Sequence, residues 1–176
     1  SRIYVVDNGN HSVNIFKTNG DFVAELEKFT ELDLFQPAGI DLFFPPDPEN
    51  RDDYKIYIAD TLNNQIKIIS QDGTCETWPQ EEDNDILDYP FNITVDQTGK
   101  MYIIDKKVED DHKTPHRLVC FDENKILVQG WGTLDKESGI GSIKPTSFAI
   151  GPDGTFFVSA SSKGCLYTYS PGLPIQ

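Results

Sequence analysis

A short alternating run that ends in aspartate recurs along the chain and limits the folds open to it more than any other feature. The run reads IYVVD at residues 3–7, IYIAD at 56–60 and MYIID at 101–105, and FFVS at 156–159 is an altered fourth copy. A polar turn and a second alternating apolar run follow each copy. Recurrence of this kind is typical of folds that stack one supersecondary unit several times.

A second phrase, which begins with proline, precedes the last three copies of the first. It occupies residues 37–42, 90–96 and 145–150, and glycine turns follow two of its copies at 97–99 and 152–154. Alternating apolar runs with glycine turns between them predict β-hairpins. No stretch of useful length has the period of an amphipathic helix.

Each repeat therefore holds several short strands, which is the make-up of a β-propeller blade of four antiparallel strands. We predict an all-β fold, with a single β-propeller domain of about four blades over residues 1–176. The blades are predicted at residues 1–34, 35–87, 88–142 and 143–176. A β-sandwich is the structural alternative, but it does not require the two phrases to recur in this order.

The two phrases together resemble the NHL repeat, in which a Pro-x-Gly-Ile-x-Val strand leads to a Tyr-Val-x-Asp strand and an Asn-rich turn. Residues 37–40, 56–66 and 4–13 match this pattern, the glycine-rich residues 139–145 resemble the approach to a next blade, and Ser159 departs from it. The resemblance implies NHL-like blades. Because such propellers usually have about six blades, it also implies part of a larger, six-bladed propeller. It is specific for the fold and says little about function.

The first residues already read as a strand, and the chain holds three proline phrases against four aspartate phrases. The tripeptide Leu173-Pro174-Ile175 resembles the start of another copy. We therefore expect the chain to be continuous with further propeller blades or domains.

Acidic residues outnumber basic ones by 29 to 15, which gives a formal net charge of −14. A chain this acidic repels phosphate backbones, so nucleic acid is not an expected partner, and the RNA binding of some basic NHL domains is disfavoured. A basic protein or peptide, or a divalent cation, fits the charge better. The alternative is that the acidity only maintains solubility.

The three cysteines, Cys75, Cys120 and Cys165, fall at different positions of their repeats and form no close pair. We predict free thiols, which favours an intracellular location, whereas glycosylation triplets at Asn10 and Asn92 point the other way, so the compartment stays open. The apolar runs are strand-sized, and neither a signal peptide nor a membrane insertion is predicted.

Asp7, Asp60 and Asp105 end their strands at the same position of the repeat, which invites a catalytic or metal-binding interpretation. We favour a structural role, because an aspartate at a strand end can accept hydrogen bonds from the backbone of the turn that follows. An aspartate that recurs in blade after blade is expected to serve the fold of each blade rather than one site. No catalytic residue is predicted.

Two acidic segments form the best candidate for a binding site. By analogy with propellers, the turns after the repeat aspartates and the loops before the proline phrases share one face. We predict that this acidic face binds a protein partner. The alternative is a pair of solvated loops. The predicted contact residues are Glu81, Glu82, Asp83, Asp85, Asp88, Glu109, Asp110 and Asp111.

No cofactor or metal site is predicted. Loop carboxylates can bind Ca²⁺, but no loop has the ligand spacing of a calcium motif. His112 and His116 would share a face only on a helix, and Pro115 argues against one. Tyr89, Phe91, Trp78 and Trp131 are candidate interface anchors, with blade-to-blade core as the alternative.

The expected function is a non-enzymatic scaffold for protein–protein interaction, because the chain lacks a nucleophile motif, a zinc motif and a phosphate-binding loop. The alternative is a metal-dependent propeller enzyme, such as a lactonase-like hydrolase or an amidating lyase. These enzymes hold a metal in the central channel by side chains near the starts of inner strands. The matching positions are Gly39, Asn92 and Ser147, of which only Asn92 is a plausible ligand.

Overall fold

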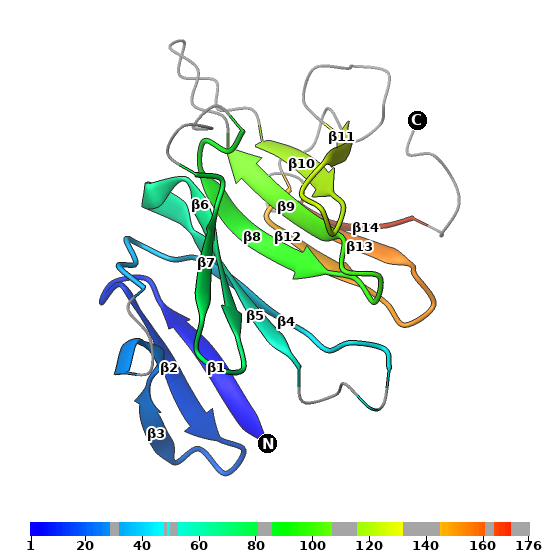
Figure 1. Cartoon of the computed structure of the whole chain (residues 1–176). Helices are drawn as coiled ribbons and strands as arrows, with labels where there is room; N and C mark the ends of the chain where they lie inside the picture. The colour runs from blue at the N-terminus through cyan, green and yellow to red at the C-terminus, as the bar shows by residue number, and fades with distance from the viewer. Residues whose placement is uncertain are drawn as a thin grey trace. The chain divides into compact units, whose positions relative to one another are not determined.

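The computed structural model describes residues 1–28, 32–47, 49, 53–80, 86–106, 116–131, 145–160 and 164–169 (Figure 1). These residues form 14 strands and the short 3₁₀ helices η1 (Leu26–Lys28) and η3 (Thr61–Asn63). The strands make four antiparallel sheets, which confirms the all-β prediction. The chain divides into two compact units, Ser1–Phe91 and Asn92–Gln176.

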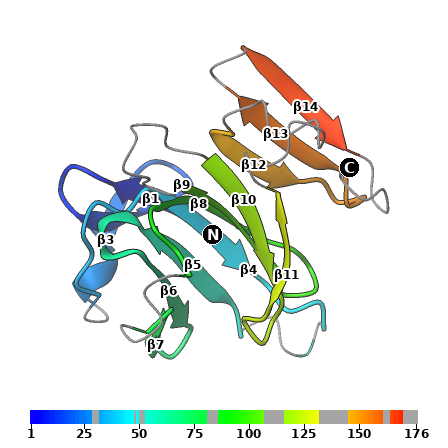
Figure 2. The same cartoon turned by 90° about the horizontal axis from the view of Figure 1, so that it is seen from above.

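The first unit contains two sheets in which the strand order follows the chain order. One has the order β1-β2-β3 (Figure 1), and the other has the order β4-β5-β6-β7 (Figure 2). The strands are β1 (Arg2–Asp7), β2 (Ser12–Lys17), β3 (Phe22–Glu25), β4 (Gly39–Phe43), β5 (Lys55–Asp60), β6 (Gln65–Ser70) and β7 (Cys75–Trp78).

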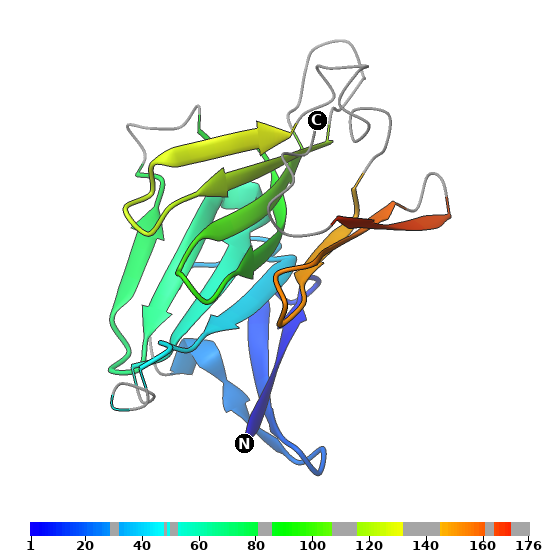
Figure 3. The same cartoon turned by 90° about the vertical axis from the view of Figure 1, so that its right-hand side faces the viewer.

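The second unit also contains two sheets, with the orders β8-β9-β10-β11 and β12-β13-β14 (Figure 3). Each proline phrase supplies the first strand of its sheet, and each aspartate phrase supplies the neighbouring one. The strands are β8 (Pro90–Val95), β9 (Met101–Lys106), β10 (His116–Phe121), β11 (Leu127–Trp131), β12 (Ser147–Ile150), β13 (Phe156–Ala160) and β14 (Cys165–Tyr169).

The core of the first unit lies between its two sheets. Val13 and Ile15 of β2 pack with Ile56 and Ile58 of β5, and all four side chains are buried. The alternation of β-branched side chains explains this layer, because every second residue of a strand points to the same face. Leu26, Leu32, Leu34 and Ile69 complete the buried cluster.

Aromatic rings join the two sheets of the second unit. Tyr102 of β9 stacks on Phe148 of β12, with ring centroids 5.4 Å apart, and Phe156 of β13 lies 5.4 Å from Tyr102 and 5.3 Å from Phe148. Ile103, Leu118 and Val158 are also buried. Aromatic pairs at this spacing contribute beyond their area of burial, by about 0.5–1.5 kcal/mol.

One turn geometry recurs at five hairpins of the two units. In each, a residue with positive φ closes a tight turn, and backbone hydrogen bonds close the loop. Glycine adopts this conformation at little cost in energy. Hairpins at residues 97–99 and 152–154 were predicted from the sequence. The residues with positive φ in these five turns are Gly20, Gly73, Gly99, Lys125 and Gly154.

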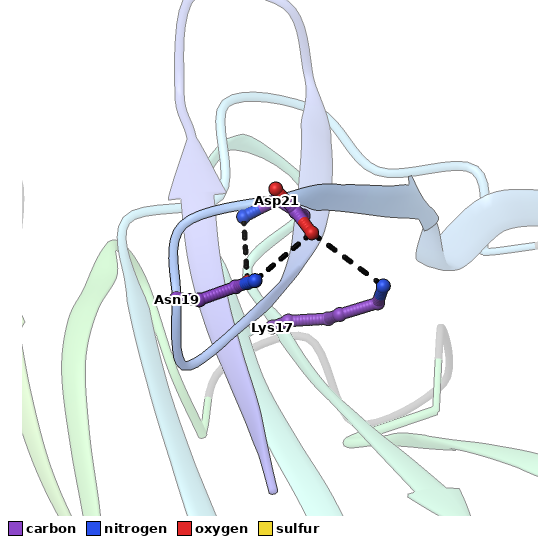
Figure 4. A network of polar contacts seen from close by, with 3 residues as sticks. All are labelled: Lys17, Asn19 and Asp21. Atoms are coloured by element: carbon purple, nitrogen blue, oxygen red, sulfur yellow. Dashed lines mark hydrogen bonds and ion pairs between the residues drawn. The ribbon is translucent and has the colours of Figure 1, made fainter.

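The β2–β3 hairpin shows how side chains support such a turn (Figure 4). The backbone N–H of Asp21 donates to Asn19 Oδ1 over 3.1 Å, and Asn19 Nδ2 donates to Asp21 Oδ2 over 3.0 Å. Lys17 Nζ lies 3.5 Å from the same oxygen, but both partners are exposed. An exposed ion pair of this kind contributes little to stability.

None of the helices in the described ranges has the length and apolarity needed to cross a membrane. Among the described residues, the three cysteines form no disulfide. Cys120 is buried and Cys165 is exposed, and burial raises the pKa of the Cys75 and Cys120 thiols.

Candidate functional site

The repeat aspartates of the first unit accept hydrogen bonds from neighbouring loops. Asp7 accepts from the side-chain amide of Asn10 over 2.8 Å and from its backbone N–H over 3.1 Å. Asp60, which is 0% exposed, accepts from the backbone N–H of Phe35 and from Asn63 Nδ2, both over 2.8 Å. The Phe35 bond comes from the segment before β4, so Asp60 ties the end of β5 to the approach to β4.

The repeat aspartate of the second unit is held by an arginine. Arg117 faces Asp105 in the register of β9 and β10, and its Nε and Nη2 atoms donate to Asp105 Oδ2 over 2.9 and 2.6 Å. Asp105 is 0% exposed, whereas the Arg117 side chain is 26% exposed. This pair could not be predicted, because residues 107–115 separate the two strands in the sequence and leave their register open.

In the fourth copy of the repeat, the strand register corrects the prediction that Ser159 replaces the aspartate. Ser159 faces Ser147 as Ala59 faces Gly39, so Ala160 is the equivalent of Asp60. The Ser159 hydroxyl lies 3.1 Å from Thr146 Oγ1. The backbone N–H of Thr146 donates to Ser159 O over 2.8 Å, as the N–H of Ala38 donates to Ala59 O in the first unit. The hydrogen bonds that Asp7, Asp60 and Asp105 accept support a structural role for the recurring aspartate. Asp60 and Asp105 are both 0% exposed and offer no carboxylate to solvent.

Most of the predicted acidic face lies outside the described residues. This holds for Glu81, Glu82, Asp83, Asp85, Glu109, Asp110 and Asp111, and for His112. Asp88 is described and is half-buried, and His116 Nδ1 lies 2.9 Å from Pro145 O. The acidic face remains a prediction.

The second unit has a cavity of about 550 Å³ beside the β8–β9 and β12–β13 hairpins. Val95, Ile150, Pro152 and Phe156 give it an apolar lining, and Asp96 supplies a carboxylate. A cavity of this size accommodates a long side chain or a small organic ligand. Sequence reasoning missed it, because it depends on how two sheets meet.

The two carboxylate oxygens of Asp96 have different surroundings. Oδ1 accepts from the N–H and hydroxyl of Thr98, over 2.8 and 2.6 Å, and from the N–H of Lys100 over 3.1 Å. Oδ2 accepts from the Tyr102 hydroxyl over 3.3 Å. Burial, above all, raises the pKa of Tyr102, so its hydroxyl stays a donor at neutral pH. Oδ2 keeps capacity to accept from a ligand.

The first unit has a smaller cavity, of about 360 Å³, which Arg2, Tyr4, Tyr54 and Asp72 help to line. Burial and a hydrogen bond with Tyr54 raise the pKa of Tyr4 to about 12. Because a basic and an acidic side chain both line this cavity, it favours neither an anionic nor a cationic ligand.

The three positions at which the enzyme hypothesis places metal ligands differ in their ability to bind a metal. Gly39 has no ligating side chain and Ser147 is exposed. Asn92 Oδ1 is buried and has no hydrogen-bond partner in the part of the chain that the structure describes. Within the same ranges, no group of three His, Cys, Asp or Glu side chains is placed to hold a metal ion.

The candidate aromatic anchors are largely covered. Trp78 is 8% exposed, and Tyr89 and Phe91 are half-buried. The side chain of Trp131 lies outside the described residues. Burial of Trp78 fits the core interpretation better than the anchor interpretation.

No protein-family model matches the chain, and no curated protein matches it. Solved structures do. Virginiamycin B lyase from Staphylococcus aureus has a TM-score of 0.56 at 11% identity, over 99% of this chain and 54% of that one. BBS1N in complex with ARL6DN has a TM-score of 0.58 at 15% identity, over 98% and 50%.

A gluconolactonase from Xanthomonas campestris is also similar, with a TM-score of 0.52 at 15% identity, over 89% of this chain and 43% of that one. The chain thus spans about half the length of the solved structures it matches or less. At these identities the likeness concerns the fold alone. The neighbours are propeller proteins, and the chain has the fold of a partial β-propeller.

Proposed function

We propose that this chain is a non-enzymatic β-propeller scaffold that binds a basic segment of a partner protein. The observation that carries the proposal is the cavity of the second unit, where an apolar lining meets the Asp96 carboxylate. The net charge of −14 supports a basic partner. A neighbour of the same fold, BBS1N, was crystallised in complex with a protein, ARL6DN.

An arginine or lysine side chain matches the cavity chemically. Its aliphatic stem would contact Val95, Ile150 and Pro152, and its charged group would donate to Asp96 Oδ2. The rings of Tyr102 and Phe156 add the possibility of cation–π contact. A hydrogen bond between charged groups contributes about 1.5–3 kcal/mol, which corresponds to an affinity change of roughly ten-fold or more.

A pair of small probes tests this chemistry. Acetyl-arginine amide and acetyl-citrulline amide have the same shape, but only the first carries a charge. In an NMR titration, we expect acetyl-arginine amide to shift the amide signals of Val95, Asp96, Thr98 and Phe156 at lower concentration than the citrulline compound. Equal shifts from both probes, or none at these residues, would refute binding of a cation in the cavity.

The predicted acidic face is tested separately, with the intact protein and its partner. Charge reversal at Glu81, Glu82 and Asp83 to lysine is expected to weaken a salt-sensitive interaction with a basic partner. The matched control reverses three exposed charges in the β4–β5 loop, Asp47, Glu49 and Asp53. If both triple variants retain the same affinity, residues 81–83 are not part of the binding surface.

A metal-dependent enzyme is the second candidate, and it is favoured by Asn92 Oδ1, which is buried and has no hydrogen-bond partner among the described residues. Virginiamycin B lyase and a gluconolactonase, which share the fold, are enzymes by name. Metal analysis of the intact protein separates the two functions. The scaffold proposal expects no stoichiometric metal, and an Asn92→Leu variant with unchanged metal content. One bound metal per chain that is lost in Asn92→Leu would favour the enzyme.

A further inference from the structure

One position of the repeat contacts the approach to the next blade in three copies. It is the residue directly before the one that faces the repeat aspartate in the strand register. In each copy, this residue contacts the segment that leads into the following proline phrase. The three contacts are His11 with Gln36, Asn64 with Asp88, and His116 with Pro145.

The contact that His11 makes requires an uncharged ring. The backbone N–H of Gln36 donates to His11 Nδ1 over 2.9 Å. A ring nitrogen of histidine accepts a hydrogen bond only when it carries no proton, and both ring nitrogens of the charged form are donors. Protonation of His11 would set two donors against each other, so this hydrogen bond would be lost.

The equivalent contact of His116 has the opposite requirement. His116 Nδ1 lies 2.9 Å from Pro145 O, and a carbonyl oxygen can only accept. Nδ1 of His116 therefore carries a proton in this contact, as it does in one neutral tautomer and in the charged ring. Protonation leaves the contact intact, so the two equivalent histidines respond differently to pH.

The hydrogen bond between His11 and Gln36 holds a strained piece of backbone. Both residues have a left-handed backbone conformation, with φ of 57° and 51°, which is costly for a residue with a side chain. The His11 ring also lies 5.1 Å from the ring of Phe35. Asn8, in the same turn as His11, donates to Pro37 O over 3.1 Å, and this bond involves no titrating group. Protonation of His11 therefore loosens the segment at Phe35 and Gln36 in particular.

The segments around His11 contain three carboxylates and neither lysine nor arginine. These segments are the turn of His11 itself, the segment of Gln36, and the loop that forms hydrogen bonds with Phe35. His11 is half-buried, so protons from solvent reach its ring. Its protonation is opposed by no neighbouring cation, and the carboxylates attract the charged ring. The segments are residues 7–12, 32–38 and 60–64, and the carboxylates are those of Asp7, Asp33 and Asp60.

We propose that His11 is a pH-sensitive latch between the β1–β2 turn and the segment before β4. While its ring is uncharged, the latch holds this segment through Gln36. Histidine is the side chain that ordinarily changes its charge between about pH 8 and about pH 5, so mild acid opens the latch. The equivalent contact of His116 stays closed over the same range. The latch does not depend on any ligand bound beside Asp96.

Amide hydrogen exchange of the full chain, followed by NMR, measures the latch at its donor. The protection factor of the Gln36 amide, which corrects for the intrinsic effect of pH, is expected to fall about ten-fold between about pH 7.5 and about pH 5. This fall should follow the titration of the His11 ring signals. The Thr146 amide is the internal control, because it donates to Ser159 O next to Pro145. Equal falls at Gln36 and Thr146 would overturn the proposal.

The variant His11→Asn separates the effect of the ring from that of Asp60, whose pKa burial raises. Asparagine can accept from Gln36 through its side-chain oxygen and does not titrate, and Asn64 has the same φ of 57° at the equivalent position. In His11→Asn, the Gln36 amide is expected to be equally protected at both pH values. The matched control, His116→Asn, is expected to keep the pH dependence of the unmodified chain. A pH dependence that persists in His11→Asn would show that another group opens the contact, and the proposal would be wrong.

Discussion

Asp7 and Asp60 occupy the same position of the repeat, yet their surroundings move their pKa values in opposite directions. Hydrogen bonds from Asn10, first from its side chain, lower the pKa of Asp7 below the ordinary 3.8. Burial raises the pKa of Asp60 above 3.8, although Phe35 and Asn63 donate to it. The recurring aspartate therefore has one place in the fold and two electrostatic environments.

Carboxyl NMR titration is expected to place the pKa of Asp7 below 3.8 and that of Asp60 above it. The stability that Asp7 contributes is present above pH 3.8 and is lost as the pH falls through its lowered pKa. The contribution of Asp60 has the opposite sign: it is full below pH 3.8 and is lost as the pH rises through its raised pKa. Asn10→Ala should return the pKa of Asp7 towards 3.8. An unchanged value would contradict the role of Asn10.

Arg117 neutralises a carboxylate that is 0% exposed, so its removal leaves a buried negative charge without this countercharge. We expect Arg117→Met to lower the free energy of unfolding by about 3–5 kcal/mol in urea denaturation at pH 7. The matched control, Lys17→Met, breaks the exposed pair with Asp21 and should cost less than about 1 kcal/mol. Similar losses in both variants would show that burial does not decide the importance of these pairs.

The strands and hairpins could be predicted from the sequence because the patterns that define them lie within a few neighbouring residues. Alternation defined β5 and β9, and the glycines of residues 97–99 and 152–154 marked two turns that the structure confirms. Contacts between strands distant in sequence were not predictable in the same way. The Arg117–Asp105 pair depends on a register across residues 107–115, and the cavity beside Asp96 depends on packing of one sheet on another.

The five recurring turns also contain one residue that does not suit its conformation. Lys125 has φ +65°, where the equivalent turns have glycine. A left-handed conformation costs a residue with a side chain about 1 kcal/mol. We expect Lys125→Gly to raise the free energy of unfolding by about 0.5–1 kcal/mol, and Gly99→Ala, at φ +84°, to lower it by a similar amount. A less stable Lys125→Gly variant would show that a contact of the lysine side chain outweighs the backbone cost.

At the scale of the whole molecule, the repeat decides which acidic side chains a partner can reach. The carboxylates of the repeat aspartates Asp60 and Asp105 accept hydrogen bonds from within the protein. The negative charge that is exposed to a partner therefore comes from positions that differ between repeats. The two candidate binding surfaces, the cavity beside Asp96 and the predicted acidic face, both lie in such segments. A net charge of −14 predicts that association with a basic partner slows as salt is added.

The binding of a cationic side chain beside Asp96 is the central claim, and one pair of variants tests it most directly. Asp96→Asn removes the charge but keeps an oxygen that can accept from Thr98 and Lys100. Asp122→Asn makes the same change in an equivalent turn, where Asp122 accepts from Asn124 and Ile126. By calorimetry or NMR titration with acetyl-arginine amide, we expect Asp96→Asn to raise the Kd about ten-fold and Asp122→Asn to leave it unchanged. Equal Kd values in the two variants would contradict the claim.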